Sequence, residues 1–315
     1  MSVKIFSGRS TEYLAKKIVK KCYKDEASEL NKCEVRVFND GEMNVHFTET
    51  IREDNVFIIQ STLGSDNIIE LFLMIDAAKR ASAQKINVVI PYFGYARSDR
   101  KDKPRVPISS KLMADLLTTA GATRVITLDL HVDQIQGFFN IPVDHLSSEY
   151  IFIPYIKNHF MDMNLVVAAT DVGGSKKVSH YSYALGVDLV LIHKERSSPG
   201  IISSMKLIGD VKGKDIVFVD DIIDTGGSIC RAAELVMNQG ANSVRAIVCH
   251  PVLSKKAYDN INSSYLKELV VTDTIPIIEG LSDKITVLSI DDMFAKAIDK
   301  ISKGVSISSE IFGAM

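Results

Sequence analysis

Three carboxylates stand beside two glycines and two hydroxyl groups in the short segment VFVDDIIDTGGSI, residues 217–229. A Thr-Gly-Gly-Ser loop that opens a helix offers backbone N–H groups, hydroxyls and the positive end of a helix dipole to a phosphate. Carboxylates repel phosphate, but they accept hydrogen bonds from neighbouring hydroxyl groups such as those of a diol. A sugar phosphate carries both features, and it is the ligand that this segment predicts.

Other motifs fit the same segment less well. Neither the GxGxxG pattern of dinucleotide folds nor the GxxxxGK[ST] phosphate loop is present. Asp224-Thr225-Gly226 matches the Asp-Thr-Gly of aspartic proteases, but those enzymes are two-lobed β proteins with a second such motif. A plain acidic turn closed by Gly226-Gly227 is the remaining structural alternative.

The elements that must position these residues are short strands alternating with helices. Apolar residues recur at three and four in residues 68–83, 109–120 and 228–239, which predicts helices. Strands are predicted at residues 3–6, 35–38, 56–60, 86–90, 124–128, 165–169, 187–193, 215–219, 244–249 and 285–290. Nearly all-apolar strands in this alternation predict parallel sheets with helices on both faces. The acids after residue 219 then lie at the carboxyl end of a strand, where such sheets bind ligands.

A repeat suggests two similar domains. ADLLTTAGATRVITLDLH, residues 114–131, aligns with AELVMNQGANSVRAIVCH, residues 233–250, and each copy is a helix, a Gly-Ala stop and a strand. Any helix–strand unit of similar length would look alike, so duplication is one of two interpretations. Under it we expect domains at 1–147 and 148–303.

Bulk composition excludes several classes of protein. The chain has 315 residues, 46% of them hydrophobic, and a net charge of -2, so we expect no general attraction to nucleic acid or membranes. No apolar run approaches the ~20 residues that span a bilayer, and the first residues do not resemble a signal peptide. Four scattered cysteines are typical of reduced thiols, so we expect a cytoplasmic protein.

Five further segments share the chain with the 217–229 motif. They are FNDGEMNVHF (38–47), PYFGYARSDRKDKPRVPISSK (91–111), LDLHVDQIQGFFNIPVDHL (128–146), ATDVGGSKK (169–177) and HKERS (193–197). The 217–229 motif alone is found in type I phosphoribosyltransferases and cannot separate an enzyme that uses phosphoribosyl pyrophosphate from one that makes it. All six in this order resemble the class I ribose-phosphate diphosphokinase family over nearly the whole chain.

The resemblance implies an α/β fold of two tandem type I phosphoribosyltransferase-like domains, each a mostly parallel sheet flanked by helices. It implies transfer of the pyrophosphoryl group of ATP to the 1-hydroxyl of ribose 5-phosphate, with Mg²⁺ as cofactor. It further implies phosphate as an activator, ADP as an allosteric inhibitor, and a homohexamer built from dimers. The last residues, 304–315, resemble a tail that packs back on the first domain.

Carried over residue by residue, the resemblance implies these roles. The catalytic residues are Lys194 and Arg196. ATP contacts are Phe38, Asp40, Gly41, Glu42, Arg97, Ser98, Asp102 and His131. Ribose 5-phosphate contacts are Asp171, Arg196, Asp220, Asp221, Asp224, Thr225, Gly226, Gly227 and Ser228. The metal ligands are His131 and Asp171, with Asp129 as a lesser candidate.

Two other functions are compatible with the sequence. The alternatives are a non-catalytic regulatory homologue that associates with an active synthase, and a nucleobase phosphoribosyltransferase.

Three residues depart from the pattern of the family. Ser98 replaces a common Gln, Asn140 replaces an Asp, and Asp133 replaces a small polar residue. Because Asp133 adds a negative charge near the family's regulatory segment, we expect altered regulation by anions.

Overall fold

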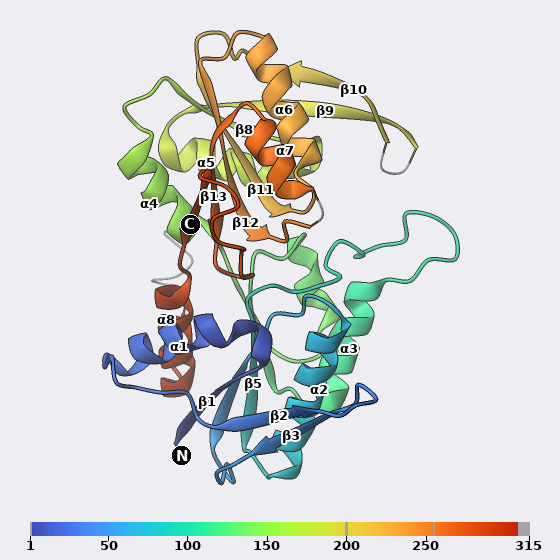
Figure 1. The fold of residues 1–315 in the computed structure, drawn as a ribbon, viewed down its shortest axis with the longest axis vertical. Coiled ribbons are helices and arrows are strands. Elements are labelled where there is room, and N and C mark those ends of the chain that lie inside the picture. Colours follow the sequence, from blue (N-terminus) through green and yellow to red (C-terminus); the bar gives the residue numbers. More distant parts are fainter. Residues whose placement is uncertain (1, 199–200, 255, 308–315) are drawn as a thin grey trace. The chain divides into compact units, whose positions relative to one another are not determined.

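The computed structural model describes residues 2–198, 201–254 and 256–307, and the side chains of 194–204 lie outside the description. The chain forms two compact units (Figure 1). The first comprises residues 1–147, 274–276 and 290–315, and the second comprises 148–273 and 277–289. The chain therefore passes four times from one unit to the other.

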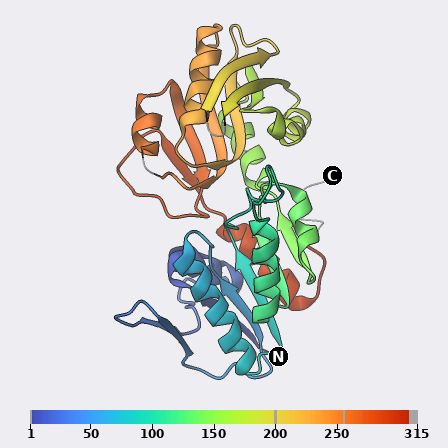
Figure 2. The ribbon, with the colours of Figure 1, turned by 90° about the vertical axis from the view of Figure 1, so that its right-hand side faces the viewer.

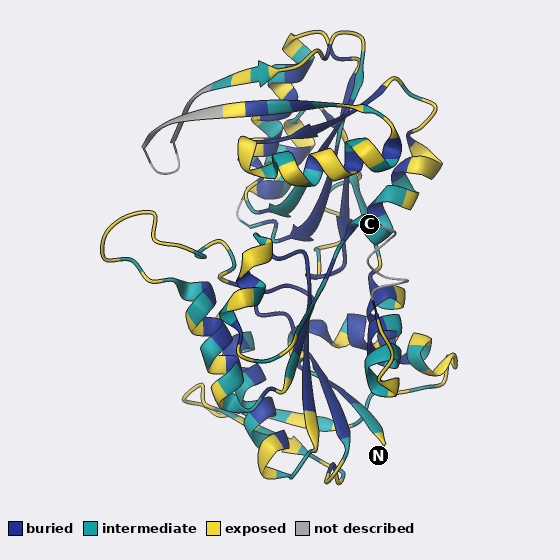
Figure 3. Ribbon diagram, turned by 180° about the vertical axis from the view of Figure 1, so that it is seen from behind, coloured by how far each residue is buried: buried dark blue, intermediate teal, exposed yellow. Residues whose placement is uncertain are grey.

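The first unit is built on a five-stranded parallel sheet. Its order is β1 (Val3–Ser7), β4 (Asn55–Ile59), β5 (Lys85–Ile90), β6 (Arg124–Leu128) and β7 (Val143–Leu146). One face is covered by α2 (Ser65–Arg80) and α3 (Ser109–Ala120), and the other by α1 (Glu12–Tyr23) and α8 (Asp291–Lys303) (Figures 1 and 2). The three central strands, β4, β5 and β6, are buried along most of their length (Figure 3) because both faces are covered.

A separate hairpin lies outside this sheet. Within the described part of the chain, strands β2 (Cys33–Val37) and β3 (Met43–Phe47) pair antiparallel only with each other, and β3 packs on α2. Exposure alternates along both strands, so one face of the hairpin turns to the body of the unit. The hairpin joins residues 38–42, a predicted ATP-binding turn, to the first unit.

Helix α8 belongs to the first unit, whereas the expected second domain, 148–303, includes it. Its apolar face, with Phe294 and Ile298 fully or almost fully buried, packs against α1. The thiol of Cys22 on α1 donates to the carbonyl of Ala295, with Sγ and O 3.8 Å apart. Burial of an amphipathic face thus decides where this helix belongs. Of the expected tail, residues 304–307 lie with the first unit, and 308–315 are outside the described residues.

The second unit is built on a seven-stranded sheet. Its order is β10 (Ile201–Ile208), β9 (Asp188–Ser198), β8 (Leu165–Ala169), β11 (Asp215–Ile223), β12 (Ser243–Pro251), β13 (Leu266–Thr272) and β14 (Ile285–Leu288). All neighbours are parallel except β9 and β10. The helices of this unit are α4 (Glu149–His159), α5 (Ser175–Leu185), α6 (Gly227–Asn238) and α7 (Ala257–Ser263).

Both copies of the sequence repeat have the expected order of helix, glycine and strand. Helix α3 ends at Ala120, directly before Gly121, with φ +125°, and α6 ends at Asn238, two residues before Gly240, with φ +91°. Strands β6 and β12 follow. Positive φ is the backbone region that favours glycine, so the two stops share a physical cause. Among the described residues, no helix has the length and apolar character needed to span a bilayer.

Candidate active site

Strand β11 carries the first two acids of the 217–229 segment, and it is longer than expected. The sequence predicts a strand over 215–219, but β11 continues to Ile223 because its last residues pair with β12. Its other neighbour, β8, ends at Ala169. Asp220 and Asp221 therefore lie on a strand that extends beyond β8, and not in a loop.

Asp220 is held in place at the end of this sheet. The Thr170 hydroxyl donates to its Oδ2 at 2.7 Å, and the Asp221 backbone N–H donates to its Oδ1 at 2.9 Å. Burial raises the pKa of Asp220 to about 7, with contributions from the Asp221 and Asp171 carboxylates. Three acids thus stand near one another where hydroxyl donors or a cation would relieve their repulsion.

The loop that follows β11 is fixed by α7 and the residues before it. Ser254 donates twice to Asp224, from its hydroxyl to Oδ1 and from its backbone N–H to the carbonyl at 3.1 Å. The Asn260 side-chain amide donates to the Thr225 carbonyl at 2.8 Å. These bonds hold the carbonyls on the α7 side and leave Thr225 exposed.

Gly226 lets the loop turn into α6. Its φ of +75° places it in the left-handed region, directly before the first helical residue, Gly227. The first N–H groups of a helix have no partner within it, so those of Gly227 and Ser228 are the donors that suit a phosphate.

Asp171 lies just beyond β8, next to the same edge. It caps the short helix η3 (Val172–Gly174), and the Gly174 N–H donates to its Oδ1 at 3.3 Å. A Cβ on Gly173 would stand 3.1 Å from that carboxylate oxygen. The glycines therefore keep the turn small around the Asp171 side chain.

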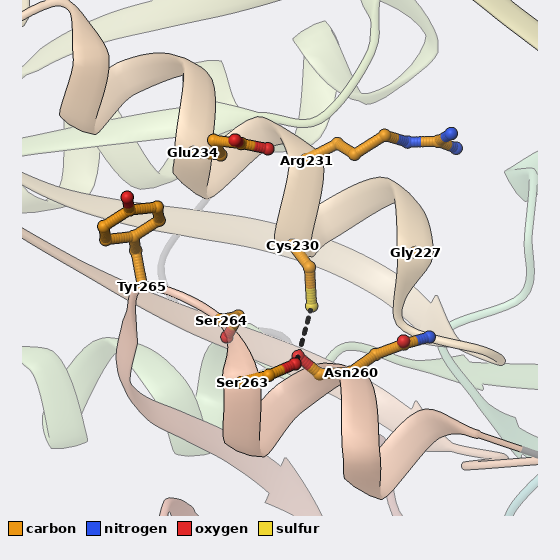
Figure 4. Close-up of a pocket in the computed structure, with 8 residues that line it drawn as sticks. All are labelled: Gly227, Cys230, Arg231, Glu234, Asn260, Ser263, Ser264 and Tyr265. Carbon is orange, nitrogen blue, oxygen red and sulfur yellow. Dashed lines mark hydrogen bonds between the residues drawn. The ribbon is translucent and has the colours of Figure 1, made fainter.

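An open pocket of about 390 Å³ lies between α6 and α7 (Figure 4). Its lining residues are Gly227, Cys230, Arg231, Glu234, Asn260, Ser263, Ser264 and Tyr265. The Cys230 thiol donates to the Asn260 carbonyl, with Sγ and O 3.5 Å apart, and burial raises its pKa. Only Gly227 of this lining belongs to the predicted sugar-phosphate site.

In the first unit, Arg97, Ser98 and Asp102 lie in the connection between β5 and α3. The Ser98 carbonyl accepts from the backbone N–H of Ser110 at 3.2 Å and from its hydroxyl at 3.0 Å. Arg97 and Asp102 are exposed. The loop is therefore fixed to α3 at Ser98, and its charged residues face outward.

This loop leaves β5 through a close backbone approach. The Gly94 N–H donates to Thr62 Oγ1 at 2.7 Å, and a Cβ on Gly94 would stand 2.2 Å from the Thr62 carbonyl oxygen. No side chain fits there, so Gly94 sets the path of the loop.

Asp129 and His131 follow β6 at the carboxyl edge of the sheet of the first unit. Asp129 is 6% exposed and has φ +39°, and its N–H donates to the Leu146 carbonyl at 3.0 Å. The next N–H, of Leu130, donates to His145 Nε2 at 2.9 Å. The backbone is thus held on both sides, and it presents His131 in an exposed position.

Residues 38–42 form the turn of the β2–β3 hairpin, apart from that carboxyl edge in both views (Figures 1 and 2). The Phe38 N–H donates to the Glu42 carbonyl at 2.8 Å, and the Glu42 N–H donates to Asp40 Oδ1 at 3.0 Å. Gly41 has φ +91°, and the Arg36 guanidinium lies 5.1 Å from the centre of the Phe38 ring. The structure does not bring this turn together with His131 within one unit.

Lys194 and Arg196 lie on β9, paired in register with Met205 and Ile202 of β10. Their side chains are outside the described part of the molecule. Strand β9 pairs with β8 up to Leu191 and also contacts η3. Its backbone therefore runs past the turn that holds Asp171.

The described residues contain no group of three or more His, Cys, Asp or Glu side chains arranged to hold a metal ion. Magnesium keeps several waters and often takes one or two carboxylates. A carboxylate such as Asp171, beside two other acids, fits that requirement. The donor set suits Mg²⁺ better than a metal that needs a full protein cage.

Three residues that the sequence motifs do not single out shape the predicted sugar-phosphate edge. They are Thr170, Ser254 and Asn260, which bond to Asp220, Asp224 and Thr225. Thr170 sits in the ATDVGG segment beside Asp171, and that position was a usable signal. Ser254 and Asn260 come from a connection that carries no motif.

The fold and the geometry at the carboxyl edge of β11 define the class of protein. Two mostly parallel α/β units, one with an acidic strand end and a Thr-Gly-Gly-Ser loop, are a tandem pair of phosphoribosyltransferase-like domains. A crystal structure of phosphoribosylpyrophosphate synthetase from Mycobacterium smegmatis superposes with a TM-score of 0.91 at 37% identity, covering 96% of this chain and 100% of that one. The expected fold class is confirmed.

Sequence relatives narrow the class to a family. The N-terminal domain of ribose phosphate pyrophosphokinase matches residues 3–121, and the phosphoribosyl synthetase-associated domain matches 198–312. Ribose-phosphate pyrophosphokinase of Porphyromonas gingivalis is 49% identical over 306 residues, 97% of this chain and 96% of that protein. The Fusobacterium nucleatum protein of the same name is 46% identical over 315 residues, 99% of this chain and 98% of that one.

The chain belongs to the ribose-phosphate pyrophosphokinase family. The predicted family and activity are confirmed: the chain is a transferase that moves the pyrophosphoryl group of ATP to ribose 5-phosphate.

Proposed function

We propose that the second unit binds ribose 5-phosphate at the carboxyl edge of β11 and β8. The observation that carries the proposal is the convergence of Asp171, Asp220 and Asp221 beside the loop that opens α6. The sugar phosphate group would accept N–H bonds from residues 225–228, and the ribose hydroxyls would donate to Asp220 and Asp221. Asp224 would shape the loop through its bonds to Ser254.

The chemical step requires positive charge around the group in transfer. The 1-hydroxyl oxygen of the sugar forms a bond to the β-phosphorus of ATP and loses its proton to water. The bond from that phosphorus to the α–β bridging oxygen breaks, and AMP leaves with that oxygen. We assign Lys194 as the main catalytic residue and Arg196 as its partner, both on β9. Fixed cations stabilise the charge that develops on the transferred phosphoryl oxygens.

The first unit would supply the ATP contacts. An exposed aromatic ring in a fixed turn suits stacking on a base, and acceptors beside it suit an exocyclic amine. We therefore propose Phe38, Asp40, Gly41 and Glu42 for the adenine. The exposed Arg97, Asp102 and His131, with Ser98, would contact the rest of the nucleotide.

We also propose Mg²⁺ as the cofactor. His131, with Asp129 as a lesser candidate, would hold an ion near the ATP phosphates, Asp171 would hold a second position near the ribose, and bound waters would complete each shell. When bound, the ion would neutralise phosphate oxygens.

Regulation and assembly extend the proposal. We expect a homohexamer built from dimers, with phosphate as activator and ADP as inhibitor. Asp133, the charge that departs from the family pattern, has its Oδ1 3.8 Å from Nδ1 of the partly buried His145. An ADP-inhibition curve that matches that of an ordinary class I enzyme at equal phosphate would contradict altered regulation by anions.

The four free cysteines support a reducing compartment, and we propose the cytoplasm.

One assay tests the activity directly. Purified protein is mixed with ATP, Mg²⁺ and ribose 5-phosphate, and AMP release is followed. Stoichiometric AMP and phosphoribosyl pyrophosphate are expected. Failure to release AMP would contradict catalysis and favour a regulatory homologue. No AMP release from this mixture, together with pyrophosphate release from added phosphoribosyl pyrophosphate that depends on a nucleobase, would favour a phosphoribosyltransferase.

A further inference from the structure

A fully buried carboxylate in the first unit has an arginine as its charged partner. Glu70 lies on α2 with 0% of its side chain exposed. Arg9 donates to it twice, from the backbone N–H to Oε1 and from Nε to Oε2, each at 2.7 Å. Buried charges are costly unless they are paired and hydrogen-bonded, so Arg9 is required to keep Glu70 where it is.

The same arginine reaches the ATP-binding hairpin. Its Nη2 lies 3.4 Å from Sδ of Met43, the first residue of β3. Met43 directly follows the turn 38–42 and pairs with Val37 at the end of β2. At the other end of the hairpin, burial raises the pKa of the Cys33 thiol to about 11, and the charge of the Glu70 carboxylate adds to that rise.

The hairpin needs such support. Two strands without a third are marginal in water, and β2–β3 is not hydrogen-bonded to the main sheet. At its base, Phe47 packs edge-to-face on Phe6, with ring centres 4.6 Å apart. Near the turn, the bonds of residues 38–42 are internal, so they fix the shape of the turn and not its direction.

We propose that Arg9 and Glu70 are positioning residues that orient the 38–42 turn toward ATP by holding Met43. This inference rests on the proposed function of that turn. The guanidinium is planar and carries Nε and Nη2 in a fixed fork, so one side chain bonds Glu70 and Met43 at once. A lone acid inside the apolar run IIELFLMI, residues 68–75, is the sequence signal for this pair.

The test compares substitutions in the full-length protein. Arg9→Lys keeps the positive charge beside Glu70 but loses the fork. Met43→Leu keeps the volume and removes the sulfur acceptor, so it folds even where Arg9→Lys does not. Phe38→Ala tests the turn itself. Arg124→Lys is the matched control, because Arg124 pairs with Asp144 elsewhere in the same unit with side chains 32% and 18% exposed.

The readouts are KM for each substrate, kcat and the thermal midpoint. Arg9→Lys is expected to raise KM for ATP about 10-fold and Met43→Leu about 3-fold, with KM for ribose 5-phosphate and kcat within about twofold of wild type. Arg124→Lys is expected to leave both KM values unchanged. The selective effect on ATP separates positioning from a general loss of structure.

Three results overturn the inference for different reasons. If Phe38→Ala raises KM for ATP while Arg9→Lys and Met43→Leu do not, the turn binds ATP but the pair does not position it. The pair also has no positioning role if both KM values rise together as the thermal midpoint falls. If Phe38→Ala leaves KM for ATP unchanged, the assignment of the turn fails and the inference fails with it.

Discussion

The hydroxyl of Thr170 donates to Oδ2 of Asp220 at 2.7 Å, which joins the residue after β8 to the projecting end of β11. This bond favours the ionised carboxylate, but burial and two neighbouring acids oppose it and raise the pKa to about 7. The carboxylates of Asp171, Asp220 and Asp221 therefore repel one another at this edge of the sheet, and a bound diol or cation would relieve that repulsion.

Replacing Asp220 by Asn is expected to stabilise the ligand-free protein in a pH-dependent way. The carboxyl ionises near 3.9 in an unfolded chain and near 7 when folded, so the folded state binds more protons between these values. Wild-type stability from this group falls as pH rises from about 4 to 7, and the amide, which never ionises, avoids that loss. The gain should be about 1–4 kcal/mol at pH 8.

Thermal midpoints of both proteins at pH 5 and pH 8 measure the effect. The difference between Asp220→Asn and wild type should grow from pH 5 to pH 8. A difference of equal size at both pH values would show that ionisation of Asp220 is not its origin.

Gly226→Ala is expected to weaken ribose 5-phosphate binding. A Cβ at φ +75° strains the backbone by about 1–2 kcal/mol and displaces the N–H groups at the start of α6. Gly280→Ala is the matched control, with φ +77° and nothing within 4 Å of its Cβ. Similar losses of thermal stability are expected, but only Gly226→Ala should raise KM for ribose 5-phosphate. Equal KM values for ribose 5-phosphate in the two variants would argue against phosphate binding by the loop of residues 225–228.

Lys194→Ala is expected to lower kcat at least about 100-fold and to leave ATP binding intact, because it removes the proposed positive charge beside the pyrophosphoryl group during its transfer. Lys206→Ala, an exposed residue on the neighbouring strand, should keep kcat within about twofold. ATP affinity measured by calorimetry separates binding from chemistry. A full loss of ATP affinity in Lys194→Ala would point to a binding role instead.

Gly94→Ala is expected to disturb the ATP side alone. The new Cβ would stand 2.2 Å from the Thr62 carbonyl oxygen, so the backbone must move, and the loop with Arg97 and Asp102 moves with it. KM for ATP should rise, and that for ribose 5-phosphate should not. Gly137→Ala has open space around its Cβ and serves as the control. Unchanged ATP kinetics in Gly94→Ala would show that the loop path does not matter to ATP.

Local patterning predicts the bounds of several elements closely. Helix 109–120 and strands 124–128 and 165–169 are found at the predicted residues, because glycine stops or a break in the apolar run mark their ends. Strands β3, β7, β10 and β13 are not predicted from the pattern. The four residues of β7, VDHL, include two polar ones, and they form a strand because β6 offers an edge to pair with.

The candidate site is likewise predictable from sequence only in part. The motif residues and their edge positions follow from sequence, since parallel strands bring their carboxyl ends together. The length of β11 does not, because pairing with β12 extends a strand through acids that are typical of a loop. The partners of Asp224 and Thr225 come from the connection before α7 and from α7 itself, about 30 residues away in sequence, and local reasoning cannot place them.

The passage of the chain between the two units has a consequence for dissection of the molecule. Residues 1–147 alone lack α8, whose Phe294 and Ile298 are buried against α1. A cut after residue 147 would therefore leave an amino-terminal fragment with an uncovered apolar groove. That fragment should become soluble and cooperatively folded when a peptide of residues 290–307 is supplied in trans, as in a split protein that reassembles by complementation.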